Sequence, residues 1–110
     1  MQPRLSAGFW VSAYLERLQL AAIPAFVTAK GDATAGAVLV KLATLDGQAK
    51  AFQRSFDFAL DARIWVILCE GNEADVDAAI ARQRGFDRDL WVLEIEDKAG
   101  RTLLDQDGLC

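Results

Sequence analysis

The chain has 110 residues, of which 53% are hydrophobic and 25% are charged, as is typical of one soluble globular domain covering residues 1–110. Its formal net charge of −4 disfavours general binding to nucleic acids, because an acidic protein repels phosphate groups. The chain contains no histidine, which excludes Ser-His-Asp and Cys-His nucleophilic catalysis and histidine-ligated zinc or iron sites.

The N-terminal region predicts a helix over residues 5–22, with Ser6 as its N-cap and Pro24 beyond its end. Apolar residues at helical spacing form one broad face, which consists of Trp10, Val11, Tyr14, Leu15, Leu18, Ala21 and Ala22. A second apolar strip is formed by Phe9, Ala13 and Leu20. Two apolar strips indicate that this helix contacts either two layers of the fold or a partner. Its uncharged run is too short for a membrane span and lacks the form of a signal peptide, so we expect a cytoplasmic protein without membrane contact.

Alternating apolar residues and turn signals predict five strands, at residues 25–30, 37–45, 48–57, 64–69 and 89–96, with a candidate return strand at 102–104. Asn72 is the expected N-cap of a second helix that ends at Gly85. Short turns between consecutive strands favour antiparallel pairing. The order α-β-β-β-β-α-β therefore predicts a two-layer α+β domain, with a mostly antiparallel sheet of about five strands and both helices on one side.

Asp46-Gly47 predicts a two-residue type I′ turn, which would pair Lys41 with Phe52 and Leu39 with Arg54. One face of this hairpin is then apolar and is assigned to the core. The other face interleaves cations with apolar side chains, and it consists of Leu39, Lys41, Lys50, Phe52, Arg54 and Phe56. Single-stranded RNA can stack its bases on such rings while cations hold its phosphates. We favour instead that Phe52, Phe56 and Leu39 pack against a second chain or a loop, with the Lys and Arg side chains lying over them, because apolar sheet faces more often mark partner contacts.

Other polar residues suggest a small-ligand or nucleotide site, whose candidates are Lys30, Arg54, Arg82, Gln83 and Arg101. The loop GDATAG at residues 31–36 offers backbone amides near Lys30 but lacks the Walker spacing of a phosphate-binding loop. Glu94 and Glu96 are interpreted as the solvent side of an edge strand rather than as a catalytic pair. The sequence indicates no catalytic residue, cofactor or metal site, which argues against an enzyme.

The two cysteines, Cys69 and Cys110, form neither a disulfide framework nor a metal-binding spacing. Cys69 lies in the apolar run IWVILCE and is expected to be buried, while Cys110 is expected to be a frayed terminal thiol. A redox pair would require the C-terminus to fold back onto the strand that carries Cys69.

Three stretches, RLSAGFWVSAYLERL, KGDATAGAVLVKLATLDG and VDAAIARQRGFDRDLWVLEIEDKAGRTLLD, resemble the small bacterial family catalogued as domain of unknown function 1491. The resemblance covers nearly the whole chain, and its most specific part is Arg82-Gln83 followed by DLWV at residues 89–92 and by Glu94, Glu96, Asp97, Gly100 and Arg101. Arg88 departs from it, because a proline is usual at this position. The resemblance implies a bacterial cytoplasmic protein of one domain and supplies no catalytic residue.

Three functional hypotheses follow, and the first is a non-enzymatic module that binds a protein partner or forms a homo-oligomer. Its candidate interaction surface consists of Phe9, Leu20, Leu39, Phe52 and Phe56. The second hypothesis is a ligand binder that uses the Lys, Arg and Gln residues named above. The third is binding of single-stranded RNA by the 37–57 hairpin, although the net charge makes nucleic acid an unfavoured partner.

Overall fold

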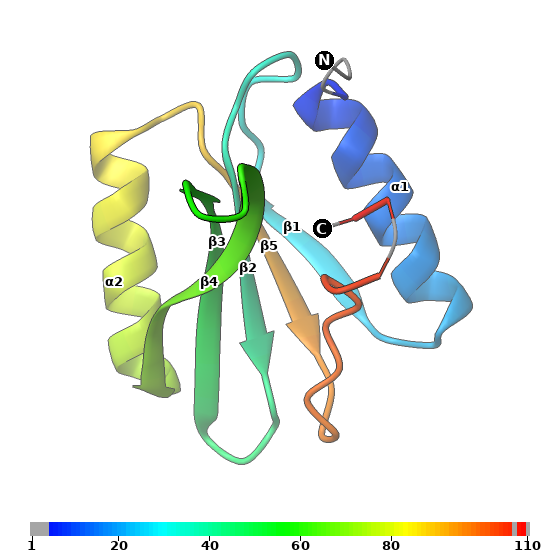
Figure 1. Ribbon diagram of the computed structural model, residues 1–110. Coiled ribbons are helices and arrows are strands. Elements are labelled where there is room, and N and C mark those ends of the chain that lie inside the picture. Colours follow the sequence, from blue (N-terminus) through cyan, green and yellow to red (C-terminus); the bar gives the residue numbers. More distant parts are fainter. Residues whose placement is uncertain (1–4, 107, 110) are drawn as a thin grey trace.

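The computed structural model describes residues 5–106 and 108–109, which form two helices and one five-stranded sheet. In chain order, the elements are α1 (Ala7–Leu20), β1 (Ala25–Ala29), β2 (Val38–Ala43), β3 (Gln48–Asp57), β4 (Ala62–Asn72), α2 (Glu73–Phe86) and β5 (Trp91–Glu96). The predicted α+β class and the order of the elements are confirmed (Figure 1). Cys110, and with it the question of a cysteine pair, lies outside the described residues.

The sheet is mixed, and its strand order is β1-β5-β2-β3-β4. The pairs β1–β5, β2–β3 and β3–β4 are antiparallel as predicted, whereas β2 and β5 are parallel. The parallel pair arises because α2 carries the chain from the end of β4 back over the sheet, so that β5 runs in the same direction as β4 and β2. This crossover inserts the last strand between β1 and β2.

The two helices cover opposite faces of the sheet, so the predicted two-layer arrangement is wrong (Figure 1). The cluster on the α1 side contains Trp10, Val11, Tyr14, Leu18, Val40, Leu42, Leu93 and Ile95. The cluster on the α2 side contains Leu39, Ala49, Ala51, Val76, Ile80 and Val92. Both faces need cover because interior strands such as β2 and β5 carry apolar side chains on both sides.

The position of β5 also corrects the interpretation of its acidic residues. Val92 is buried in the cluster under α2, and Glu94 contacts the buried side chain of Lys41. β5 is therefore an interior strand, although Glu94 and Glu96 alternate with apolar residues as they would on an edge strand. Alternation alone cannot distinguish an interior strand from an edge strand when a buried cation such as Lys41 neutralises Glu94.

The predicted N-caps of both helices are confirmed. Ser6 Oγ accepts a hydrogen bond from the Phe9 N–H at 3.3 Å, and the Asn72 side chain accepts one from the Asp75 N–H at 2.9 Å. Gly85 does not end the second helix as predicted, because α2 continues to Phe86. Within the described residues, no helix is both long and apolar enough to span a membrane.

The segment after β5 forms no return strand at residues 102–104, contrary to the prediction. It packs instead on the α1 side, where Leu104 and Leu109 join the core cluster. The Tyr14 hydroxyl donates a hydrogen bond to the Thr102 carbonyl at 2.7 Å, and burial raises the pKa of Tyr14 above its ordinary value. The Tyr14 side chain of α1 thus holds this segment by a hydrogen bond, in place of the pairing with a neighbouring strand that was predicted.

The register of the β2–β3 hairpin differs by one residue from the prediction. Phe52 pairs with Val40 rather than with Lys41, and Gln53 rather than Arg54 pairs with Leu39. Because side chains alternate between faces, this single shift separates residues that were predicted to share a surface. Phe52 faces the α1 side with Val40, while Leu39 faces α2.

The physical reason for the shift is a loop of three residues, 45–47, instead of two. The Asp46 carboxylate accepts hydrogen bonds from Thr44 Oγ1 at 2.6 Å and from the Gln48 N–H at 3.1 Å. Leu45 and Gly47 have positive φ angles of 63° and 86°, whereas a type I′ turn would require them at Asp46 and Gly47. The side chain of Asp46 therefore organises a longer loop than the Asp-Gly pair predicts.

Candidate functional site

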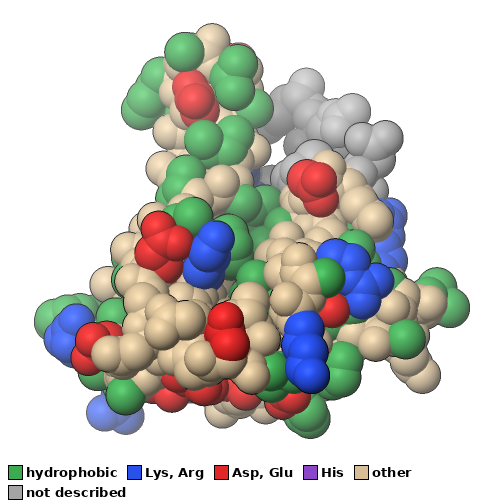
Figure 2. Space-filling model, turned by 90° about the horizontal axis from the view of Figure 1, so that it is seen from below, with side chains coloured by type: hydrophobic (Ala, Val, Ile, Leu, Met, Phe, Trp, Pro, Cys, Tyr) green, Lys and Arg blue, Asp and Glu red, His purple; other side chains and the backbone are tan. Residues whose placement is uncertain are grey.

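The outer part of the β3–β4 hairpin extends beyond the sheet, and we call residues 54–65 the arm. β3 pairs with β2 only as far as Gln53, whereas β3 and β4 continue to pair with each other as far as Asp57 and Ala62. Figure 2 shows this end of the hairpin as a protrusion covered largely by hydrophobic side chains. The base of the arm is where we locate the candidate site.

Three cavities surround this base, with volumes of about 300, 360 and 410 Å³. The first lies on the α2 side, where β3 leaves β2. The second lies between the arm and the N-terminal end of α1, and the third lies between the arm and the segment after β5. Arg63 lines all three cavities, and Arg54 lines the first two. Two cations are thus placed at the junction of the cavities.

Arg54 is held between two indole rings at the base of the arm. Its guanidinium carbon lies 4.8 Å from the ring centroid of Trp10 and 4.9 Å from that of Trp65. Its Nη2 donates a hydrogen bond to the Leu109 carbonyl at 3.0 Å, and Trp65 Nε1 donates to the same oxygen at 3.1 Å. The hydrogen bonds fasten the C-terminal segment to the arm, and the cation–π contact with Trp10 joins the arm to α1.

Only two of the five predicted ligand-binding residues lie together, because Arg54 and Gln83 both line the first cavity. Arg101 forms an ion pair with Asp97 at 3.0 Å beyond the end of β5. The Lys30 carbonyl accepts a hydrogen bond from Arg84 at 3.1 Å, and Arg82 lies near Cys69. The predicted set therefore does not form one site.

Arg63 pairs with Phe56 across the arm and was not among the predicted site residues. The signal was present, because Arg63 and Trp65 alternate along β4 as Arg54 and Phe56 alternate along β3. The predicted fourth strand began at residue 64, whereas β4 begins at Ala62. Extending that strand by two residues would have placed Arg63 at the base of the arm.

The predicted interaction surface is divided among three parts of the molecule. Phe9 and Leu20 are exposed on α1, and Phe56 is exposed on the arm. Leu39 is only 1% exposed and belongs to the core under α2, so its place on an interaction surface is corrected. Phe52 is partly buried against the α1 cluster. The register shift explains why Leu39 and Phe52 point to different sides.

The same shift corrects the face that was considered for RNA binding. Lys50, Phe52 and Arg54 share the α1 side, whereas Leu39 and Lys41 face α2. Lys50 lies 3.8 Å from Glu70 on the adjacent strand, and Arg54 lies between two tryptophans. Lys50, Phe52 and Arg54 thus share one face as predicted, whereas the assignment of Leu39 and Lys41 to that face is wrong.

Two backbone amides of the GDATAG loop are hydrogen-bonded by a side chain of the loop itself. The Asp32 carboxylate accepts hydrogen bonds from the N–H groups of Thr34, at 3.2 Å, and of Ala35, at 2.8 Å. A Cβ atom at Gly31 or Gly36 would come within 2.2 or 2.4 Å of the Asp89 carbonyl. The glycines thus allow the loop to pack closely against the chain that enters β5, and the N–H groups of Thr34 and Ala35 are already used by Asp32.

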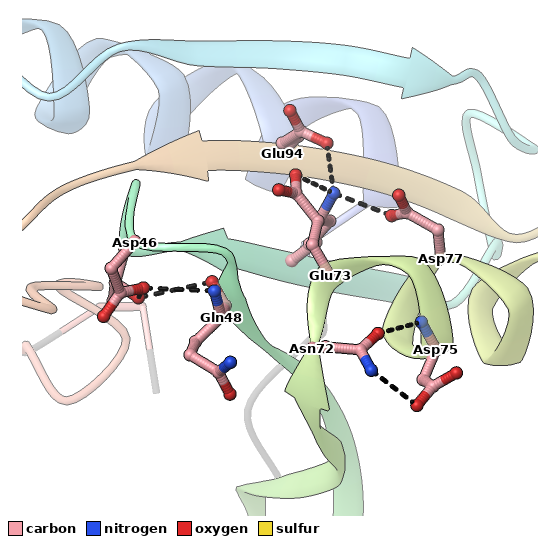
Figure 3. Close-up of polar contacts among 9 residues, drawn as sticks. Asp46, Gln48, Asn72, Glu73, Asp75, Asp77 and Glu94 are labelled. Carbon is pink, nitrogen blue, oxygen red and sulfur yellow. Dashed lines mark hydrogen bonds and ion pairs between the residues drawn. The ribbon is translucent and has the colours of Figure 1, made fainter.

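Lys41 is buried at the centre of an acidic cluster beside the start of α2. Figure 3 shows the side chains of Glu73, Asp77 and Glu94 pointing toward one shared nitrogen atom. Lys41 is 3% exposed. Its Nζ lies 2.8 Å from Glu73 Oε1, 2.7 Å from Asp77 Oδ1 and 3.0 Å from Glu94 Oε1. Burial alone would lower the pKa of Lys41, but the hydrogen bonds that its ammonium group donates to Asp77, Glu73 and Glu94 outweigh this effect and raise the pKa above its ordinary value. Lys41 therefore stays charged and links β2, α2 and β5.

Lys41 was predicted to lie on the hairpin's outer face, and its partners come from elements far apart in the sequence. The only sequence signal was one cation within the apolar run AVLVKLATL.

Across residues 5–106 and 108–109, no group of three or more His, Cys, Asp or Glu side chains is placed to hold a metal ion. In the acidic cluster, the ammonium group of Lys41 neutralises carboxylates by direct ion pairs.

Comparison with known proteins places these features in a family. Residues 5–105 match the family described as "Protein of unknown function (DUF1491)". A crystal structure of a DUF1491 family protein from Caulobacter crescentus CB15 is 39% identical, with a TM-score of 0.84, and the match covers 93% of this chain and 96% of that chain. No protein with a curated description matches this chain.

Two solution structures are also similar to this chain. The NMR structure of a DUF1491 family protein from C. crescentus CB15 is 39% identical, with a TM-score of 0.81, and the match covers 94% of this chain and 96% of that one. A protein from A. tumefaciens is 32% identical, with a TM-score of 0.71, and the match covers 86% of both chains.

The fold and the site together define a small α+β domain with a helix on each face of a mixed sheet and a projecting hairpin arm. The match over residues 5–105 shows that the chain belongs to the DUF1491 family. The resemblance noted from the sequence is thereby confirmed.

Proposed function

We propose that this protein is a protein-interaction module and that the arm is its contact element. The proposal is carried by the exposure of Phe58 and Leu60 at the end of the arm, which are 89% and 66% exposed. Apolar side chains gathered on a soluble domain are characteristic of surfaces that bind other proteins. Full burial of one such side chain contributes about 1.5–3 kcal/mol, which is enough to make it an important contact.

The end of the arm is ordered by its own contacts, which supports this role. The Asp57 carboxylate accepts hydrogen bonds from the N–H groups of Ala59, at 2.9 Å, and of Leu60, at 3.1 Å. The rings of Phe56 and Phe58 meet edge to face with centroids 4.9 Å apart. A contact element that is already ordered loses less conformational entropy when it binds.

A cytoplasmic location is part of the proposal. It is supported by Cys69, which is a free thiol in the described part of the chain and whose pKa is raised by burial. Free thiols of this kind are typical of reducing compartments.

The test replaces Phe58 by glutamate and asks which proteins are cross-linked to the tagged chain in its native cells. The matched control is Phe86→Glu, because Phe86 is 86% exposed on α2 and does not belong to the arm. We expect specific partners to be lost with Phe58→Glu and kept with Phe86→Glu. Equal capture by wild type and Phe58→Glu would refute the arm as the contact element.

A further inference from the structure

Within the described residues, the outer edge of β4 pairs with no strand. The strand order β1-β5-β2-β3-β4 places β4 at one end of the sheet, where it pairs with β3 only (Figure 1). No backbone hydrogen bond from another described segment reaches residues 64–70. A row of outward N–H and C=O groups is recognised by an added β-strand, so the backbone itself specifies the kind of partner that fits this edge.

The side chains of β4 are those of an interior strand. Residues 64–69, IWVILC, are six consecutive apolar residues, a pattern typical of strands inside a sheet. Ile67 is nevertheless 47% exposed at this edge. Edge strands usually carry charges or prolines that discourage pairing, and these six residues contain neither. The composition of β4 therefore also favours continuation of the sheet.

The opposite edge of the sheet, β1, is protected against pairing. β1 has only five residues and directly follows Pro24. Its register with β5 is irregular between Val27 and Ala29. Short length, proline and irregular pairing are features that discourage an added strand. Because only the β4 edge is open, an assembly through this edge closes at two copies and does not continue as a fibre.

We propose that β4 pairs antiparallel with β4 of a second copy of this chain across a two-fold axis, so that the two five-stranded sheets become one. A two-fold axis perpendicular to the sheet brings identical strand edges together in antiparallel orientation, which pairs their outward N–H and C=O groups. Such an axis keeps the two faces of the sheet distinct. Residues that pair across it must therefore lie on the same face.

A bulge in β4 determines which residues share a face. Leu68 is the extra residue, because Cys69 pairs with Ala51 whereas Ile67 pairs with Phe52. Phe52 faces the α1 side and Ala51 faces the α2 side. Counted through the bulge, the α1 side of β4 carries Arg63, Trp65, Ile67 and Glu70, and the α2 side carries Ile64, Val66 and Cys69.

The strand fits a copy of itself in one particular register. Two registers that match the faces use nearly the whole strand, and they are centred on Val66 and on Ile67. The register centred on Ile67 places the apolar ring of Trp65 opposite Glu70 of the second copy. The register centred on Val66 places Trp65 opposite Ile67 and Arg63 opposite Glu70. It therefore opposes apolar with apolar and cation with anion, whatever contacts Arg63 keeps within its own chain.

The experiment measures the mass of the full chain by sedimentation and light scattering, with reductant present, up to about 1 mM, where even weak association is populated. We expect a dimer for wild type. Arg63→Glu and Glu70→Arg should each weaken it by at least about fivefold, because each change puts like charges opposite one another at two symmetric positions. Glu16→Arg is the charge-matched control, since Glu16 is exposed on α1, and should leave the dimer unchanged.

A mixture of the two weakened variants tests the register. In a mixed pair, the introduced glutamate of one chain faces the introduced arginine of the other, and the native Glu70 faces the native Arg63. Both opposite-charge pairs are then restored, so the mixture should associate more tightly than either variant alone. Circular dichroism confirms that each variant is folded. No gain on mixing folded variants overturns the register centred on Val66.

A cross-link tests the axis without changing any charge. Val66 faces its own copy in the proposed register, so Val66→Cys should form a disulfide between two chains on oxidation. The native thiols are removed by Cys69→Ser and Cys110→Ser in the same chain. Phe86→Cys in that background is the control, because Phe86 is 86% exposed on α2 and should link more slowly. Equal rates of linking for the two variants overturn the pairing.

The mass of the wild type also decides the inference directly. Wild type that stays monomeric throughout, assemblies that grow beyond two copies, or a dimer unchanged by Glu70→Arg would overturn it. None of these outcomes depends on Phe58, on which the proposed function is tested. Conversely, cellular capture that is independent of Phe58 would overturn the arm as the contact element and leave the pairing of β4 intact.

Discussion

Lys41 shows how one buried cation organises charges from three elements. Two of its partners, Glu73 and Asp77, lie in the first turns of α2, where acidic side chains also interact favourably with the positive end of the helix. The third partner, Glu94, comes from β5. Because the Lys41 side chain is almost fully enclosed, its charge depends on these carboxylates rather than on water.

Replacing Lys41 by methionine should lower the free energy of unfolding by about 3 kcal/mol, near the lower end of the cost of breaking a buried ion pair. The lower end applies because Glu73 and Asp77 are partly exposed and can be rehydrated. Urea unfolding followed by circular dichroism measures the change. Lys50→Met is the matched control, since the Lys50 side chain is 47% exposed and lies 3.8 Å from Glu70, and it should cost less than about 1 kcal/mol.

The pKa of Lys41 also predicts how stability depends on pH. Its pKa in the folded chain is raised above the ordinary value of 10.5, so the unfolded chain loses this proton first. The contribution of Lys41 is thus fully present below pH 10.5 and is lost as the pH rises further. Tyr14, whose pKa is raised by burial, acts in the same direction above pH 10. The free energy of unfolding of wild type should therefore fall more steeply at alkaline pH than that of Lys41→Met. Parallel curves of this free energy against pH would contradict the role of the ion cluster.

At the scale of elements, the arm and the C-terminal segment stabilise each other. Arg54 and Trp65 of the arm both donate hydrogen bonds to the Leu109 carbonyl, and the Leu109 side chain is buried in the α1 cluster. Tyr14 holds the same segment through the Thr102 carbonyl. Leu104 and Leu109 of this segment are therefore part of the core.

Leu109→Ala should lower the free energy of unfolding by about 2–3 kcal/mol, because it removes a buried side chain close to the chain end. Leu20→Ala is the control, because Leu20 is exposed at the end of α1 and should change stability little. Chemical denaturation of both variants gives the comparison. If the two changes were equal, the C-terminal segment would not contribute to the core as the structure indicates.

At the scale of the whole molecule, stability should decrease from the centre of the sheet toward the arm. β5 pairs with strands on both sides, and side chains from both helices cover its two faces. The arm pairs only within itself and exposes its end to water. These differences in pairing and burial control how readily each region opens.

Amide hydrogen exchange measured by NMR should therefore be slowest in β2 and β5 and at least about 100-fold faster in the arm. Exchange from the arm that is as slow as from β5 in the dilute chain would contradict this ranking.

The amino-acid sequence by itself determined the elements of this protein and much of its local chemistry. Helical spacing of Trp10, Val11, Tyr14 and Leu18 identified the buried face of α1, and Ser6 and Asn72 identified both N-caps. These features depend on residues within a few positions of each other, so a local pattern is sufficient to recognise them. The family resemblance was readable for the same reason, since it rests on contiguous motifs.

Only the tertiary structure decided which strands are neighbours, which faces are covered and where the site lies. The side chain of Asp46 lengthened one loop by a residue, and this moved Leu39 away from Phe52. The α2 crossover placed β5 in the interior and brought Glu94 to Lys41. Arg54, Arg63 and the C-terminal segment likewise meet through contacts between distant parts of the chain. Such contacts depend on topology and packing, which local residue patterns do not specify.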